Sequence, residues 1–322
     1  MAFLLRVPRT VGTAGDLLHP SVPLLEPGEP VTTPAIEQVS HPRATSTGTA
    51  PTGIPPAPPN SRAALARVED GFLRSVGLGA SLRPGASIVV DDAGIYYDPR
   101  RDSRLALILK EAAFPAPLVA RARRLREEVV ARRLSKYNVG LDAGTADWPA
   151  GRRVVLVPGQ VEDDASIRLG AGAERTNLAL LRRARAANPG ALIVWKPHPD
   201  VEAGLRPGAI AAADLAGLAD VTAAHAPAAE LIDAVDAVWT ITSTLGFEAL
   251  LRGRRVVTHG RPFYAGWGLT EDRDPPPRRG RRLSLDELVA GALVLYPRYR
   301  DPITGLPCPP EVLLERLATA AA

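Results

Sequence analysis

The chain of 322 residues has one cysteine, one methionine and no apolar run of the ~20 residues that a membrane-spanning helix needs. Cys308 therefore cannot form a disulfide within the chain, and no other Cys or His lies near it at metal-ligand spacing. The apolar segment that begins at Met1 is interrupted at Arg6, which makes it too short for a secretion signal. These absences predict a cytoplasmic protein without a metal site or a cofactor.

Lysine is also scarce. Of the 39 basic residues only Lys110, Lys136 and Lys196 are lysine, and the 35 acidic residues leave a net charge of +4. A codon bias explains this preference for arginine better than nucleic-acid binding does. The arginine runs alternate with apolar residues or prolines, and not with aromatic residues that could stack on bases. The sequence predicts no nucleic-acid partner, and leaves anionic small substrates and an acidic membrane surface open.

Proline is concentrated at the amino end, where twelve of the 32 prolines fall within the first 60 residues, among many Ser, Thr and Gly. Such a composition cannot bury enough apolar surface to fold by itself. We expect residues 1–60 to form a disordered tail and the ordered protein to begin near residue 60.

Short β-branched runs alternate with amphipathic segments over the rest of the chain. Strands are expected at 87–90, 153–157, 191–195, 237–241 and 255–257, and helices at 117–134, 176–187, 228–234 and 244–252. This alternation predicts an α/β fold with a doubly wound parallel sheet. No G-x-G-x-x-G or G-x-x-x-x-G-K-[ST] pattern opens these units, which argues against a dinucleotide oxidoreductase and a P-loop NTPase.

Polar residues follow three of the expected strands, at the sheet edge where such folds bind their ligands. We expect the three loops to converge on one crevice. Their candidate site residues are Gln160, Asp163 and Asp164 after the first strand, Lys196, His198 and Pro199 after the second, and Thr242, Ser243, Thr244 and Glu248 after the third.

Each loop has a chemical and a structural interpretation. Asp163 or Asp164 can cap the following helix, or can serve as a nucleophile or general base. His198, fixed between two prolines, can donate to a phosphate or act as an acid.

The third loop, 242–244, precedes a helix whose free N–H groups form an anion site. Glu248 accepts the hydroxyls of a ribose or is a surface or capping residue. The aromatic run at 262–270 is a packed hinge or a stacking surface.

Eight motifs follow one another between about residue 66 and about residue 308. They are 68–79 (VEDGFLRSVGLG), 94–98 (GIYYD), 135–138 (SKYN), 160–166 (QVEDDAS), 196–200 (KPHPD), 242–250 (TSTLGFEAL), 262–270 (PFYAGWGLT) and 295–299 (LYPRY). In this order they resemble the bacterial capsular polysaccharide biosynthesis and export family, whose members transfer β-linked Kdo (3-deoxy-D-manno-oct-2-ulosonic acid) to the lipid linker of capsules.

The resemblance implies a GT-B-like retaining glycosyltransferase with two Rossmann-type halves, which uses CMP-β-Kdo as donor and a glycolipid as acceptor. The family's Gln-x-x-x-Asp motif falls on Gln160 and Asp164, and its His-Pro motif on His198. In the family the aspartate is taken as the nucleophile and the histidine is placed at the donor phosphate. On this hypothesis we further place Lys196, Pro199, Thr242, Ser243, Thr244 and Glu248 at the nucleotide. Glu69, Asp70 and Arg74 are placed on the acceptor side, with Glu69 and Asp70 as candidates for the base.

The amino end departs from the family pattern, because residues 1–60 show no strand-helix-strand unit. We therefore expect an incomplete or atypical amino-terminal half at 61–148 and a donor-binding half with terminal helices at 149–322. The alternatives are a truncated, non-catalytic capsule-assembly module that binds nucleotide or glycolipid, and a GT-B-like 2-epimerase. Peripheral association with the inner membrane or with the capsule export machinery stays open.

Overall fold

A computed structural model describes residues 3–7, 64–75, 85–136, 148–276 and 279–321. The chain divides into one compact unit, Met1–Leu5 with Ala66–Ala322, and a second, Arg6–Leu65. The expected tail and the motif residues Tyr137 and Asn138 lie largely or wholly outside the described residues, so the expected disorder stays a prediction.

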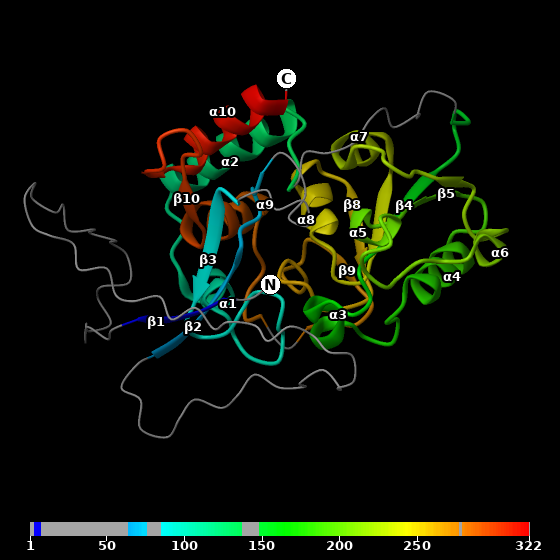
Figure 1. The fold of residues 1–322 in the computed structure, drawn as a ribbon, viewed down its shortest axis with the longest axis horizontal. Coiled ribbons are helices and arrows are strands. Elements are labelled where there is room, and N and C mark those ends of the chain that lie inside the picture. The colour runs from blue at the N-terminus through cyan, green and yellow to red at the C-terminus, as the bar shows by residue number, and fades with distance from the viewer. Residues whose placement is uncertain (1–2, 8–63, 76–84, 137–147, 277–278, 322) are drawn as a thin grey trace, which may run out of the picture. The chain divides into compact units, whose positions relative to one another are not determined.

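A six-stranded parallel sheet forms the second half of the larger unit (Figure 1). β-branched and apolar residues fill its central strands, and all five residues of both β4 and β5 are buried. The predicted doubly wound sheet is thereby confirmed. The strands, in spatial order, are β6 (Val221–Thr222), β5 (Leu192–Lys196), β4 (Val154–Pro158), β7 (Ala237–Thr240), β8 (Arg255–Thr258) and β9 (Glu271–Asp272).

The strand order places a topological switch point between β4 and β7, because the chain winds outward from these two neighbours in opposite directions. Helices pack on both faces of the sheet. Val155 and Val157 of β4 belong to one core cluster, and Leu156 belongs to the other. The helices of this half are α3 (Ala165–Gly170), α4 (Asn177–Ala187), α5 (Pro199–Glu202), α6 (Ala212–Leu215), α7 (Ala228–Ala234) and α8 (Thr244–Leu251).

The first sheet has the order β1-β2-β3-β10-β11, and its pairings from β2 onward are antiparallel. Among the described residues this sheet shows no parallel βαβ unit of a Rossmann half, as is expected for an incomplete or atypical amino-terminal half. Its strands are β1 (Phe3–Val7), β2 (Ala64–Asp70), β3 (Ser87–Asp91), β10 (Arg298–Arg300) and β11 (Pro307–Cys308).

The end of the chain returns to this first sheet, where α10 lies along α2 (Figure 1). Arg298 of β10 pairs with Ile88 of β3, and Arg121 of α2 forms an ion pair of 2.7 Å with Glu311 of α10. The expected boundary at 148/149 stays a prediction, but residues from both sides of it build this half. Its helices are α1 (Arg104–Glu111), α2 (Ala116–Ala131), α9 (Leu285–Val289), the π-helical segment η4 (Ala290–Leu295) and α10 (Pro310–Ala321).

The aromatic run at 262–270 is interior packing. Phe263, Tyr264 and Trp267 are at most 5% exposed, and the Phe263 ring stacks on Phe72 of the first half with centroids 4.5 Å apart. Of the two interpretations drawn from the sequence, the packed hinge is the one that the structure supports, because no face of these rings is open to a ligand.

Gly246 of α8 gives a stability prediction. A Cβ at this position would overlap the hydroxyl of Tyr264, which donates a hydrogen bond of 2.5 Å to Ser243 O. Alanine normally stabilises a helix relative to glycine by about 1 kcal/mol. Here we expect Gly246→Ala to lower the free energy of unfolding by about 1–3 kcal/mol through overpacking, measured by urea denaturation.

Gly190→Ala is the matched control, since a Cβ there would meet no described atom within 4 Å. Equal denaturation midpoints for the two variants would show that Gly246 is not needed for the close approach of Tyr264.

Candidate active site

The side chain of Gln160 spans the switch point. Its Nε2 donates to Thr242 Oγ1 at 3.0 Å, and its Oε1 accepts from Thr242 N at 3.0 Å and from Thr240 Oγ1 at 3.3 Å. Gln160 follows β4, Thr240 ends β7 and Thr242 follows it, so one buried amide joins the ends of these strands. The amide therefore holds the two loops together at the sheet edge where the topology predicts that a ligand binds.

Asn177 fixes the same loop from its other side. Its Oδ1 accepts from Gln160 N at 2.9 Å, and its Nδ2 donates to Gln160 O at 2.8 Å and to Gly208 O at 2.7 Å. Its own N–H donates to Glu162 Oε1 at 2.7 Å. The sequence analysis missed this residue, because an asparagine at the start of a helix has no pattern that separates it from an ordinary turn residue.

Asp164 caps α3 with one oxygen and leaves the other available. Its Oδ1 accepts from Ser166 N at 2.8 Å and from Ser166 Oγ at 2.7 Å. Among the described residues, Oδ2 has no hydrogen-bond or ion-pair partner. Thr242 Oγ1 lies 3.4 Å from Ser166 Oγ, so a continuous hydrogen-bonded path joins Gln160 to this half-buried carboxylate. Capping and chemistry are thus compatible at Asp164, whose catalytic role stays a prediction.

Asp163 has a different environment. It is exposed, and its Oδ1 forms an ion pair of 2.7 Å with Arg206 Nη2. Nothing in the sequence favoured one of the two neighbouring aspartates over the other. In the structure they differ in exposure and in partner, and Asp164 is the one that hydrogen bonds connect to Gln160.

His198 caps α5, and its Nδ1 accepts from Asp200 N at 3.1 Å. An accepting Nδ1 places the proton on Nε2 in the neutral ring. Burial lowers the pKa of His198. The Asp200 and Asp164 carboxylates oppose this shift, and the charges of Lys136 and Arg206 add to it. The imidazole is therefore a neutral N–H donor within the electrostatic reach of Asp164.

The predicted anion ligands lie at the ends of β5 and β7. Lys196 ends β5 and is 7% exposed, burial lowers its pKa, and no described residue forms an ion pair with it. Ser243 caps α8 by accepting from Leu245 N at 3.2 Å, and Thr244 is the first residue of that helix. Pro199 is the first residue of α5. Their ligand roles stay predictions.

Glu248 lies in the interior. It is 7% exposed, and its Oε1 accepts from the backbone N–H of Lys136 at 3.0 Å. Its Oε2 is buried and has no hydrogen-bond partner among the described residues, and burial raises the pKa of the carboxyl. The surface and capping interpretations of this residue are therefore wrong, and the ribose interpretation stays a prediction.

The acceptor-side candidates at the end of β2 separate into a pair and a single carboxylate. Asp70 Oδ2 and Arg74 Nε form an ion pair of 2.5 Å, so these two side chains neutralise each other. Glu69 Oε1 accepts from Asp70 N at 3.0 Å. Burial, and after it the charges of Glu69 and Asp164, raise the pKa of Tyr97 to about 12.

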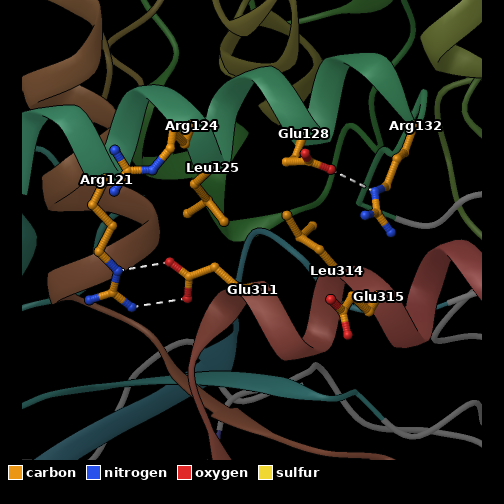
Figure 2. Close-up of a pocket in the computed structure, with 8 residues that line it drawn as sticks. All are labelled: Arg121, Arg124, Leu125, Glu128, Arg132, Glu311, Leu314 and Glu315. Carbon is orange, nitrogen blue, oxygen red and sulfur yellow. Dashed lines mark hydrogen bonds and ion pairs between the residues drawn. The ribbon is translucent and has the colours of Figure 1, made fainter.

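A groove of about 400 Å³ between α2 and α10 lies apart from these residues (Figure 2). Two ion pairs, Arg121–Glu311 at 2.7 Å and Arg132–Glu128 at 2.8 Å, compensate charges within it. It contains none of the predicted site residues. The groove is lined by Arg121, Arg124, Leu125, Glu128, Arg132, Glu311, Leu314 and Glu315.

The described residues contain no group of three or more His, Cys, Asp or Glu side chains that could hold a metal ion. No helix among them is both long enough and apolar enough to cross a bilayer.

A family model described as capsule polysaccharide biosynthesis protein matches residues 57–143 and 131–299. The chain belongs to this family. Capsule polysaccharide modification protein LipA of Neisseria meningitidis serogroup A is 50% identical over 240 residues, which cover 74% of this chain and 34% of LipA. Lipopolysaccharide-processing protein LpsZ of Rhizobium meliloti is 50% identical over 238 residues, which cover 73% of this chain and 54% of LpsZ.

Two solved structures show the same fold. The chain is similar to the beta Kdo 2,4 transferase of Thermosulfurimonas dismutans KpsC, with a TM-score of 0.72, 37% identity and 78% of each chain covered. The beta Kdo 2,7 transferase of the same protein gives a TM-score of 0.66, 39% identity and coverage of 79% of this chain and 77% of that chain. The predicted GT-B-like fold is confirmed, and this member of the capsule biosynthesis family spans about a third to a half of its curated relatives' length.

His259 gives a pH prediction for this family member. It follows β8, is 2% exposed, and its Nδ1 lies 3.1 Å from Glu174 Oε2. Burial lowers its pKa despite that carboxylate, so the unfolded chain binds more protons than the folded chain below about pH 6.5. We expect the free energy of unfolding to fall as the pH drops from about 6.5, and to fall less steeply in His259→Gln.

The control for this measurement is His225→Gln, since His225 is exposed. Urea titrations between about pH 5.5 and 7.5 compare the slopes, and equal slopes for His259→Gln and the native protein would contradict the prediction.

Proposed function

We propose that the chain is a retaining glycosyltransferase that transfers Kdo from CMP-β-Kdo to a glycolipid linker in capsule biosynthesis. The observation that carries the proposal is the Asp164 carboxylate, held by Ser166 through one oxygen and available at the other, in the electrostatic reach of the neutral His198. The similarity to KpsC Kdo transferases at 37% and 39% identity supports the choice of sugar.

The chemistry requires two displacements. Asp164 Oδ2 attacks the anomeric carbon of the donor, the bond from that carbon to the phosphate oxygen breaks, and CMP leaves with the electron pair. An acceptor hydroxyl then attacks the same carbon from the opposite face and releases the Asp164 carboxylate, so two inversions give retention.

Residues at the carboxyl ends of β5 and β7 balance the negative charge of the leaving CMP. The Nε2–H of His198 donates to the phosphate, and the Lys196 ammonium and the N-terminus of α8 with Ser243 and Thr244 add to the anion site. Two features of Lys196 support its place in this site. No described residue forms an ion pair with it, and its burial strengthens the attraction to an anion that takes the place of water.

The acceptor hydroxyl must lose its proton in the second step. Glu69 is proposed as that base. The charges of Glu69 and Asp164 both raise the pKa of Tyr97, so the two carboxylates act on one ring, whereas Asp70 is paired with Arg74. A glycolipid acceptor further implies that the enzyme works at a membrane surface, and association with the inner membrane or the export machinery belongs to the proposal.

A second candidate is a non-catalytic module that binds nucleotide or glycolipid. The antiparallel first sheet favours it, because a Rossmann-type half is missing from the described residues. Calorimetric binding of CMP without any transfer of Kdo to a Kdo-primed glycolipid would select this candidate.

Asp164→Asn tests the nucleophile. We expect it to lower transfer from CMP-Kdo, generated in situ, by at least about 1,000-fold, because an amide oxygen cannot form the covalent intermediate. Asp163→Asn is the control and should keep transfer within about twofold, since that side chain is exposed and paired with Arg206. Equal losses in both variants, or no loss in Asp164→Asn, would contradict the assignment.

Ser166→Ala tests the path that holds Asp164. The variant keeps the backbone N–H cap but loses the hydroxyl that donates to Oδ1 at 2.7 Å. We expect kcat to fall about tenfold with KM nearly unchanged, because the variant loses roughly one hydrogen bond that stabilises the transition state. Ser166→Thr should restore most of the rate, and a KM effect without a kcat effect would refute the positioning role.

A further inference from the structure

We infer that the loop between β10 and β11, residues 301–306, docks the protein on an anionic lipid bilayer. Two apolar side chains of the loop, Ile303 and Leu306, enter the lipid, and two cations of β10, Arg298 and Arg300, face the headgroups. The inference rests on the proposed function, since it names the surface by which the enzyme reaches a glycolipid acceptor. None of the predicted site residues lies in this part of the chain.

The loop carries the two most exposed large apolar side chains of the described residues. Ile303 is 73% exposed and Leu306 is 64% exposed. Pro302 and Pro307 beside them are exposed as well. Single exposed apolar side chains are ordinary on a protein surface, but several on one turn form a patch, and such a patch marks contact with lipid or with a partner.

Hydrogen bonds hold this loop in one conformation. Asp301 is buried, and its Oδ1 accepts from Ile303 N at 2.9 Å. Its backbone accepts from Gly305 N at 2.8 Å and donates to Leu306 O at 2.9 Å. Its carboxylate also forms an ion pair of 3.2 Å with Arg316 of α10. A loop that is ordered before it binds loses little conformational entropy when its apolar side chains enter a bilayer.

The charges beside the loop are positive. Arg298 and Arg300 are exposed, and as alternate residues of β10 they lie on one face of the sheet. Among the described residues, neither forms an ion pair, and Arg300 Nε donates only to Gly305 O, at 2.9 Å. The acidic residue of the loop, Asp301, is already paired with Arg316. An apolar tip with unpaired cations at its edge is the pattern that binds an anionic membrane surface.

The loop leaves the sheet at the end where the acceptor-side residues lie. Arg298 of β10 pairs with Ile88 of β3, and Ile88 pairs with Asp70 of β2. Both pairings are antiparallel, so β10 and β2 run in the same direction and finish at the same end of the sheet. β3 alone separates the two strands, a distance of about 10 Å. A glycolipid whose acyl chains stay in the bilayer under the loop therefore has its sugar near the end of β2, which carries the proposed base Glu69.

The size of the surface favours a bilayer over a protein partner. Specific protein interfaces take about 20–30 residues from each partner, far more than the loop and its two flanking arginines offer. A membrane surface needs only a few apolar side chains to enter it and cations to meet its phosphates. The occupant that fits this surface is therefore an anionic phospholipid bilayer.

Vesicle binding tests the docking surface without transfer. The full chain is sedimented with vesicles of phosphatidylglycerol and phosphatidylcholine, and the bound fraction gives a partition coefficient. We expect Ile303→Ser combined with Leu306→Ser to lower this coefficient by about 10–100-fold, because two apolar side chains no longer enter the lipid. Leu205→Ser is the matched control and should bind as the native protein does, since Leu205 is 62% exposed but lies between α5 and α6 of the other half.

The contribution of charge is tested separately. Arg298→Gln should weaken binding to the anionic vesicles by about fivefold, the effect of one cation near such a surface. Arg182→Gln on α4 changes the net charge equally and should have little effect. The inference is overturned if the native protein does not sediment with anionic vesicles. It is also overturned if the double serine variant binds them as the native protein does, which is the result expected of a surface that binds a protein.

Two acceptors separate this inference from the proposed function. Transfer to a Kdo-primed glycolipid in vesicles should fall about tenfold in the double serine variant, in step with the lost binding. Transfer to the deacylated, water-soluble form of the same acceptor should stay within about twofold, which also shows that the variant is folded. Equal transfer from both proteins to the vesicle-borne acceptor would contradict the docking surface. A native protein that binds vesicles and transfers Kdo to neither acceptor would contradict the proposed function alone.

Discussion

The hydrogen bonds of the Gln160 amide across the switch point are the interaction on which the candidate site depends. Parallel strands that diverge at a switch point leave a crevice between their loops, and nothing in the sheet itself fixes the loops relative to each other. Gln160 supplies that connection, with Thr242 as partner at both its amide atoms. Because the group is buried, loss of either partner leaves an unpaired polar atom, so the bond constrains both loops strongly.

The constraint continues from Gln160 to the proposed nucleophile. Thr242 links to Ser166, and Ser166 holds one oxygen of Asp164, so the carboxylate can present only its other oxygen to a substrate. This arrangement reconciles a helix cap with a reactive group. A carboxylate held in one orientation needs little reorganisation when it attacks. Preorganised sites lower the activation free energy mainly in this way.

The two halves of the unit carry different parts of the proposed site. Asp164, His198 and the proposed phosphate ligands follow strands of the parallel sheet, while the proposed base Glu69 lies in β2 of the first half. The buried pair Glu248 and Arg252 joins them through the backbone of 134–136. The two halves are therefore joined by contacts between α8 and a segment more than 100 residues away from it in sequence.

The sequence predicted the parallel sheet and its loops well, because buried parallel strands read as continuous β-branched runs and the topology then fixes where their polar ends meet. It did not predict that β10 and β11 return to the first sheet, since Arg298–Arg300 and Pro307–Cys308 are too short for any periodicity. The contacts of Glu248 and Asn177 could not be predicted either, because a side chain that bonds to a distant backbone group leaves no local pattern in the sequence.

The most direct test of the central claim is peptide mapping by mass spectrometry after incubation with CMP-Kdo in the absence of acceptor. The account predicts one Kdo added to the peptide that contains Asp164, and its removal when a Kdo-primed glycolipid is supplied. Transfer that proceeds with retention while no adduct forms, or while the adduct lies on another residue, would contradict it.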